Sequence, residues 1–83
     1  MARKEFCEKD GIYISYTNND VCFEDLTTAE SILLSNKGEI IHSNFDDTKN
    51  EYFKNYLKQI YPAIISFKIK AKYLQKIYQK SFQ

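Results

Sequence analysis

Apolar residues recur at helical spacing without a break through the second half of the chain. The interval alternates between four and three residues, as it does along the buried face of an amphipathic helix. The series consists of Phe53, Leu57, Ile60, Ile64, Phe67, Ala71, Leu74 and Tyr78. Asp46 or Asp47 can cap the first turn with a side-chain oxygen. The pattern therefore predicts one long helix over residues 47–81.

Pro62 is the residue in this run that opposes a helix. Proline has no amide donor, and its ring clashes with the carbonyl four residues earlier. Two antiparallel helices would need turn-forming residues at this point, but Ile60-Tyr61 precede the proline and Ala63-Ile64 follow it. We therefore expect a single helix that is kinked near Pro62.

Such a helix would be about 50 Å long, which exceeds the body of a domain of 83 residues. Part of its apolar face would then extend past the rest of the fold. We expect that face to serve a homodimer or to fill a hydrophobic groove of a partner. The expected seam is Phe53-Leu57-Ile60-Ile64-Phe67-Leu74.

The first half of the chain has the pattern of short strands. Residues 12–16 and 21–24 are rich in β-branched and aromatic types, and the segment 17–20 between them favours a turn. Residues 27–38 allow two interpretations. They can form a helix with a capping box at Thr27 and Glu30, or residues 31–35 and 39–43 can form a second hairpin around a turn at 36–38. We favour the hairpin, and the helix stays an alternative.

These elements predict a single α+β domain over residues 1–83. A small antiparallel hairpin or meander over residues 11–43 is followed by the long helix. The division falls between an acidic, β-rich part (1–45) and a basic, amphipathic helical part (46–83). No run approaches 18 apolar residues, and the first residues lack the apolar core of a secretory signal. We expect a cytoplasmic protein with no membrane partner.

Charge is separated along the chain. Residues 1–53 hold all 11 acidic residues and five basic ones, a net charge of −6, whereas residues 54–83 hold seven lysines and no acid, a net charge of +7. Such asymmetry favours electrostatic steering toward a charged partner. The alternative is that the two halves attract one another and so help the domain to fold.

Lysines of the helix are the first candidate binding residues. Lys68, Lys72, Lys76 and Lys80 recur every four residues and form a stripe away from the apolar seam. Lysine stripes neutralise phosphates, and an aromatic neighbour can stack on a base. The candidate set for a nucleic acid or a partner is Lys68, Lys70, Lys72, Tyr73, Lys76 and Lys80. The alternative is a solvated helix face, and the lack of arginine on the helix argues against reading of base sequence.

Acidic residues offer a second candidate surface. Glu24, Asp25, Asp46 and Asp47 could imitate nucleic-acid phosphates and occupy a basic groove of a partner. Capping of the helix is the alternative explanation for the last two.

Residues with catalytic potential form no recognisable motif. His42 is the single histidine, and Cys7 and Cys22 do not have the spacing of a zinc site. Two glycines cannot build a phosphate-binding loop. We therefore predict no catalytic residues, no metal and no cofactor, and a protein that is not an enzyme.

The amino-acid composition indicates a gene from an AT-rich genome, such as that of a low-GC bacterium, its phages or its mobile elements. Forty-one of the 83 residues belong to types with AT-rich codons and eight to types with GC-rich codons. In size, coding composition, aromatic content and lack of catalytic motifs, the chain resembles the small inhibitors of phages and mobile elements, such as anti-CRISPR proteins.

That resemblance implies binding to a nucleic-acid-handling effector of a prokaryotic defence system, or to its guide RNA. The alternatives are a small nucleic-acid-binding regulator that uses the lysine-rich helix, and an immunity or antitoxin protein that binds a toxin.

Overall fold

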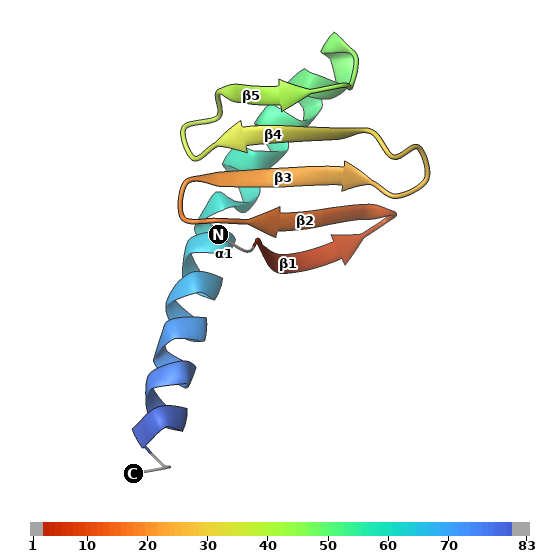
Figure 1. Cartoon of the computed structure of the whole chain (residues 1–83). Coiled ribbons are helices and arrows are strands. Elements are labelled where there is room, and N and C mark those ends of the chain that lie inside the picture. Colours follow the sequence, from red (N-terminus) through yellow and green to blue (C-terminus); the bar gives the residue numbers. More distant parts are fainter. Residues whose placement is uncertain (1–2, 81–83) are drawn as a thin grey trace.

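The computed structural model describes the backbone of residues 3–80 and the side chains of residues 3–72. Five strands precede one helix: β1 (Lys4–Lys9), β2 (Ile12–Tyr16), β3 (Asp20–Asp25), β4 (Ser31–Ser35), β5 (Ile40–Ser43) and α1 (Asp47–Lys80). The strands form one antiparallel sheet in sequence order, and α1 runs across them behind the sheet (Figure 1). The predicted α+β class is confirmed.

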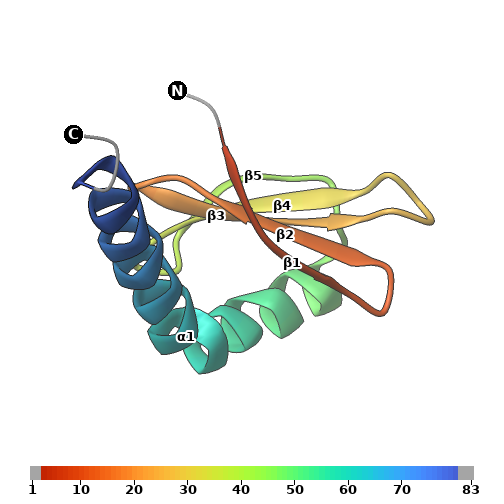
Figure 2. The same ribbon diagram turned by 90° about the horizontal axis from the view of Figure 1, so that it is seen from below.

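Only one face of the sheet is covered. Figure 2 shows α1 against one face, and no other element of the described chain lies on the opposite face. The buried apolar residues of β2, β3 and β4 accordingly lie at alternate positions along each strand. In β3, for example, Val21 and Phe23 are fully buried while Glu24 is exposed.

The second hairpin is confirmed, and the alternative helix over residues 27–38 is wrong. Gly38 has a φ of +86°, which suits the left-handed position of the turn, and the Ser35 amide donates to the Glu39 carbonyl at 2.8 Å. Alternation explains the outcome, because Ile32 and Leu34 both point into the core of the sheet and are fully buried. A helix would separate these two side chains by about 200°.

Strand β1 was not predicted, because charged residues occupy four of its six positions. A bulge between Glu5 and Cys7 interrupts its pairing with β2, so simple alternation is hidden. Both Phe6 and Cys7 pack against the core as a result. The Phe6 ring meets the Phe67 ring edge-on, with centroids 5.5 Å apart.

Aromatic side chains join the sheet to the first half of α1. The Phe53 ring stacks on Phe23 of β3 at 5.1 Å and on Phe45 at 5.0 Å between centroids. Burial of each such ring contributes about 1.5–3 kcal/mol. The buried core as a whole consists of Ile14, Tyr16, Val21, Phe23, Ile32, Leu34, Phe45, Phe53, Leu57 and Ile64.

This core uses residues that were expected to form a dimer seam. Phe53, Leu57 and Ile64 are buried against the chain's own sheet, so a second copy could reach them only by opening the fold. Ile60 packs against the same core, and Phe67 is 41% exposed. The residues expected to form a dimer seam therefore make a largely intramolecular contact, and the prediction of that seam is wrong for them. The side chain of Leu74 lies outside the described residues.

Pro62 lies inside an uninterrupted helix. A single long helix, rather than two antiparallel ones, is therefore correct, and the kink near Pro62 stays a prediction. The molecule extends 51 Å in its longest dimension and 25 × 22 Å in the others, because the last turns of α1 continue beyond the sheet (Figure 1). Within residues 3–80, α1 carries too many charged residues to qualify as a membrane-crossing helix.

Two isoleucines on α1 test the assignment of the core. Ile64 is fully buried, whereas Ile69 is 62% exposed. We expect Ile64→Ala to lower the free energy of unfolding by about 2–5 kcal/mol, because it removes packed methyl groups and leaves a cavity. Ile69→Ala should change it by less than about 0.5 kcal/mol. Urea unfolding monitored by circular dichroism measures both, and equal losses would contradict the docking of α1.

A second pair of variants tests the loop before β4. Ala29 has a φ of +63°, a region that disfavours a Cβ atom. Ala29→Gly should therefore stabilise the protein by about 0.5–1 kcal/mol. The matched change Ala63→Gly, at an exposed helical position, should destabilise it by about 1 kcal/mol. Thermal unfolding of both variants decides the matter; a loss of stability in both would show that Ala29 is unstrained.

Candidate functional site

A groove opens where the second half of α1 passes the turn that follows β2. It has a volume of about 360 Å³. Three lysines and three aliphatic residues form most of its wall: Lys4, Lys68, Lys72, Ile65, Ile69 and Ala71, with Tyr16 and the turn residues Thr17 and Asn18 opposite. We call this feature the lysine groove.

Local structure explains how these side chains meet. Lys68 and Lys72 are four residues apart on α1, as are Ile65 and Ile69, so each pair shares one side of the helix. Lys4 reaches the groove because it pairs with Tyr16 across β1 and β2. Neither half of the chain builds the groove alone.

The lysine groove is positively charged without compensation. None of the described residues that line it is acidic. The ion pairs of the described residues join Arg3 to Asp20 at 2.7 Å, Lys49 to Glu30 at 3.6 Å and Lys54 to Glu51 at 3.6 Å. Lys4, Lys68 and Lys72 take part in none of them, so their charges are free to attract an anion.

Tyr16 supports the groove from beneath. Tyr16 is only 4% exposed, and its ring packs edge-to-face with the Phe67 ring, with the two centroids 6.1 Å apart. The Lys68 ammonium lies 5.2 Å from the centre of the same ring, a cation–π contact that holds the lysine at the groove. The ring therefore positions Lys68 and does not offer an open face to a ligand.

The structure brings together part of the predicted basic set. Lys68 and Lys72 line the lysine groove, while Lys70 is exposed on α1 but is not among its lining residues. The side chains of Tyr73, Lys76 and Lys80 lie outside the described residues. Sequence reasoning missed Lys4, because the strand that carries it was not recognised. It also missed Ile65 and Ile69, although an apolar pair four residues apart and off the main seam was a usable signal.

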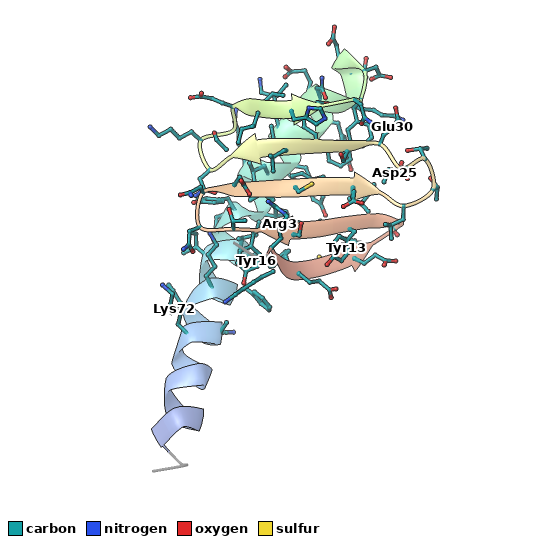
Figure 3. All side chains as sticks on the ribbon, viewed as in Figure 1. Arg3, Tyr13, Tyr16, Asp25, Glu30 and Lys72 are labelled. Atoms are coloured by element: carbon teal, nitrogen blue, oxygen red, sulfur yellow. The ribbon has the colours of Figure 1, made fainter. Side chains whose placement is uncertain are left out.

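The acidic candidates gather at the other end of the molecule. Figure 3 shows Asp25 and Glu30 at the loop between β3 and β4, far from Lys72 in the view. The Lys49–Glu30 pair ties that loop to the start of α1, where Asp46 and Asp47 lie. Only Lys54–Glu51, a local pair within α1, joins the two oppositely charged halves among the described ion pairs. The helix is docked mainly by its apolar contacts with the sheet, and Lys49–Glu30 adds one ion pair at its start.

Two of the four acidic candidates, Asp25 and Asp46, have structural roles. The Asp46 carboxylate accepts the Lys49 amide at 2.8 Å and so caps α1. Asp25 accepts the amides of Thr27 and Thr28, at 2.9 and 3.3 Å, and the Thr27 hydroxyl at 2.6 Å. These bonds to Thr27 and Thr28 lower the pKa of Asp25. Glu24 and Asp47 are exposed.

Arg3 has a structural role that the sequence did not reveal. On the open face of the sheet it donates to the Ser15 hydroxyl at 3.0 Å and to the Ser15 carbonyl at 3.2 Å, besides its pair with Asp20. It thereby ties the start of β1 to β2 and β3 (Figure 3). The only arginine of the chain is thus occupied.

The remaining reactive groups do not assemble into a centre. Desolvation raises the pKa of the Cys22 thiol, with Glu24 and Asp20 adding to the effect against the opposing charge of Arg3. Desolvation and the charges of Glu5 and Glu24 likewise raise the pKa of Tyr13. Both groups are protonated at neutral pH. His42 is exposed on β5, and no three potential ligands among the described residues lie close enough to hold a metal ion.

Comparison with known proteins found no matching family model, no similar curated protein and no similar solved structure.

Asp25 gives a pH-dependent test of the loop. Because its pKa is lowered in the folded state, its stabilising contribution is present above the unfolded-state pKa of about 3.9 and is lost as the pH falls through the folded-state value. We expect Asp25→Ala to lower the melting temperature at pH 7 and to converge with the wild type in acid, once the pH is below the lowered folded-state pKa.

Glu39→Ala, at an exposed acid of the next loop, is the control and should leave the melting temperature nearly unchanged at both pH values. A constant difference between Asp25→Ala and the wild type across the pH range would show that the carboxylate charge does not hold the loop.

Proposed function

We propose that this protein is a non-enzymatic binding protein whose contact surface is the lysine groove. The observation that carries the proposal is the set of three lysines, Lys4, Lys68 and Lys72, that surround an apolar floor and have no acidic neighbour in the groove. A folded chain gains nothing in stability by gathering like charges, since they repel one another. An anionic partner removes that cost.

The distribution of the other polar groups supports binding rather than catalysis. Asp25 and Asp46 hold a loop and a helix end, and Arg3 joins strands. Cys22 carries its proton at neutral pH, so it is a poor nucleophile. A large uncompensated charge at one end of the molecule instead speeds association with a partner of opposite sign.

The partner we propose is a nucleic-acid-handling effector of a prokaryotic defence system, which the protein inhibits. Coding composition, small size and aromatic content support this assignment. The lysine groove would contact an acidic surface of the effector or its guide RNA. An inhibitor of this kind needs only to occupy a surface, for which a rigid sheet with one projecting helix is sufficient.

A second candidate function is a small nucleic-acid-binding regulator, favoured by the spacing of lysines along α1. Lys68 and Lys72 belong to a stripe that continues to residues 76 and 80 of the same helix. Binding through such a stripe alone would weaken by about a hundredfold or more between 50 and 200 mM salt.

A plaque assay tests the inhibitor. The protein is expressed in a low-GC bacterium that carries an RNA-guided nuclease directed against a phage, and phage yield is measured. We expect the wild type to restore phage growth and Lys4→Glu/Lys68→Glu/Lys72→Glu to lose this effect, because three charge reversals repel an acidic contact. Binding of the purified effector should weaken by about tenfold or more.

The charge-matched control is Lys9→Glu/Lys37→Glu/Lys58→Glu, since these lysines are exposed and lie outside the lysine groove. It should behave as the wild type. Equal loss in both triple variants would show that total charge, and not the lysine groove, controls binding. No inhibition across a panel of such effectors would contradict the proposed target.

A further inference from the structure

We infer that the lysine groove binds an acidic protein segment that inserts one apolar side chain between Ile65 and Ile69. This inference rests on the proposed function and names its partner chemistry. Both an acidic protein surface and a nucleic acid would satisfy the charge of the groove, and the inference selects the acidic protein surface.

The charge of the groove requires an anion. Lys68 and Lys72 lie four residues apart on α1, and Lys4 faces them from β1. Lysine ammonium groups bind single carboxylates as point charges and do not need the planar geometry that arginine offers. Alternating carboxylates along a peptide fit lysines presented on separate elements.

The floor of the groove requires an apolar group as well. Ile69 is 62% exposed although it is a large aliphatic residue, and Ile65 and Ala71 extend the same surface. A volume of about 360 Å³ lies in the range of sites that enclose a small ligand or a few side-chain groups. Burial of one leucine, isoleucine or phenylalanine here would exclude water from both surfaces.

A nucleic acid fits this floor less well. Bases bind to single-strand proteins by stacking on exposed aromatic rings. Among the described residues, the aromatic one that lines the lysine groove is Tyr16, which is 4% exposed and already contacts Phe67 and the Lys68 ammonium. Arg3, which could stack on a base, is held by Asp20 and Ser15.

Peptide selection followed by nuclear magnetic resonance tests the inference. A phage-displayed library of random dodecamers is selected on the immobilised full-length protein, and the consensus peptide and a twelve-residue oligouridylate are each titrated into ¹⁵N-labelled protein. We expect selected peptides to combine Asp or Glu with a Leu, Ile or Phe. Their amide shift changes should lie at Tyr16–Asn18 and Ile65–Lys72, with weaker binding of the oligouridylate.

Two serine variants of similarly exposed isoleucines separate the floor from general surface effects. Ile69→Ser should weaken the consensus peptide by about tenfold, while Ile41→Ser, on β5 and 57% exposed, should leave its affinity unchanged. Both positions are at the surface, so both variants should retain the dispersed amide spectrum of the folded protein.

Three outcomes would overturn the inference. Tighter binding of oligouridylate than of any selected peptide, with shifts at the lysine groove and no effect of Ile69→Ser, would assign the groove to nucleic acid and leave the proposed binding function standing. Peptides without acidic bias, or shifts elsewhere, would remove the acidic segment as partner. A lack of shift changes at the groove with either probe would remove the proposed contact surface as well.

Discussion

Burial of one sheet face beneath one helix is the contact on which the rest of this structure depends. Five short strands in an antiparallel meander do not form a stable core until their apolar face is covered. Phe53, Leu57 and Ile64 of α1 supply that cover over β3 and its neighbours. Because a single helix does this work, the opposite face stays in water, and the strands must alternate between apolar and polar side chains.

The direction and length of α1 place the lysine groove. The helix runs across the strands and continues past the edge of the sheet (Figure 1). Apolar contacts hold its first half, whereas residues from Ile65 to Lys72 meet the end of β2, the turn that follows it and the first half of β1. The groove therefore forms at the point where the helix leaves the sheet. This position separates the lysines from the acidic loop at the other end, so the charge separation of the sequence persists in the folded molecule.

Several polar residues that suggest function in the sequence serve the fold instead. Asp25 orders a loop, Asp46 caps α1, and Arg3 ties three strands together. In each case the geometry satisfies backbone or side-chain donors that would otherwise lack a partner. The lysines of the groove differ from these residues because none of the described hydrogen bonds or ion pairs uses their side chains. That difference separates candidate binding residues from structural ones.

The sequence by itself determined the class of the fold, because period-two and period-3.6 apolar patterns are local and survive in any tertiary arrangement. Strands β2 and β3, the favoured hairpin around Gly38, a cap at Asp46 or Asp47 and the single helix through Pro62 all follow from neighbouring residues. It did not reveal β1, since a bulge breaks the alternation around Phe6 and charged residues surround it. Only the tertiary structure decided that Lys4 joins Lys68 and Lys72, and that Phe53, Leu57 and Ile64 face the sheet rather than a second copy. These outcomes depend on contacts between residues far apart in the chain, such as Phe23 with Phe53 and Tyr16 with Lys68, and the spacing of residues along a chain carries no information about such contacts.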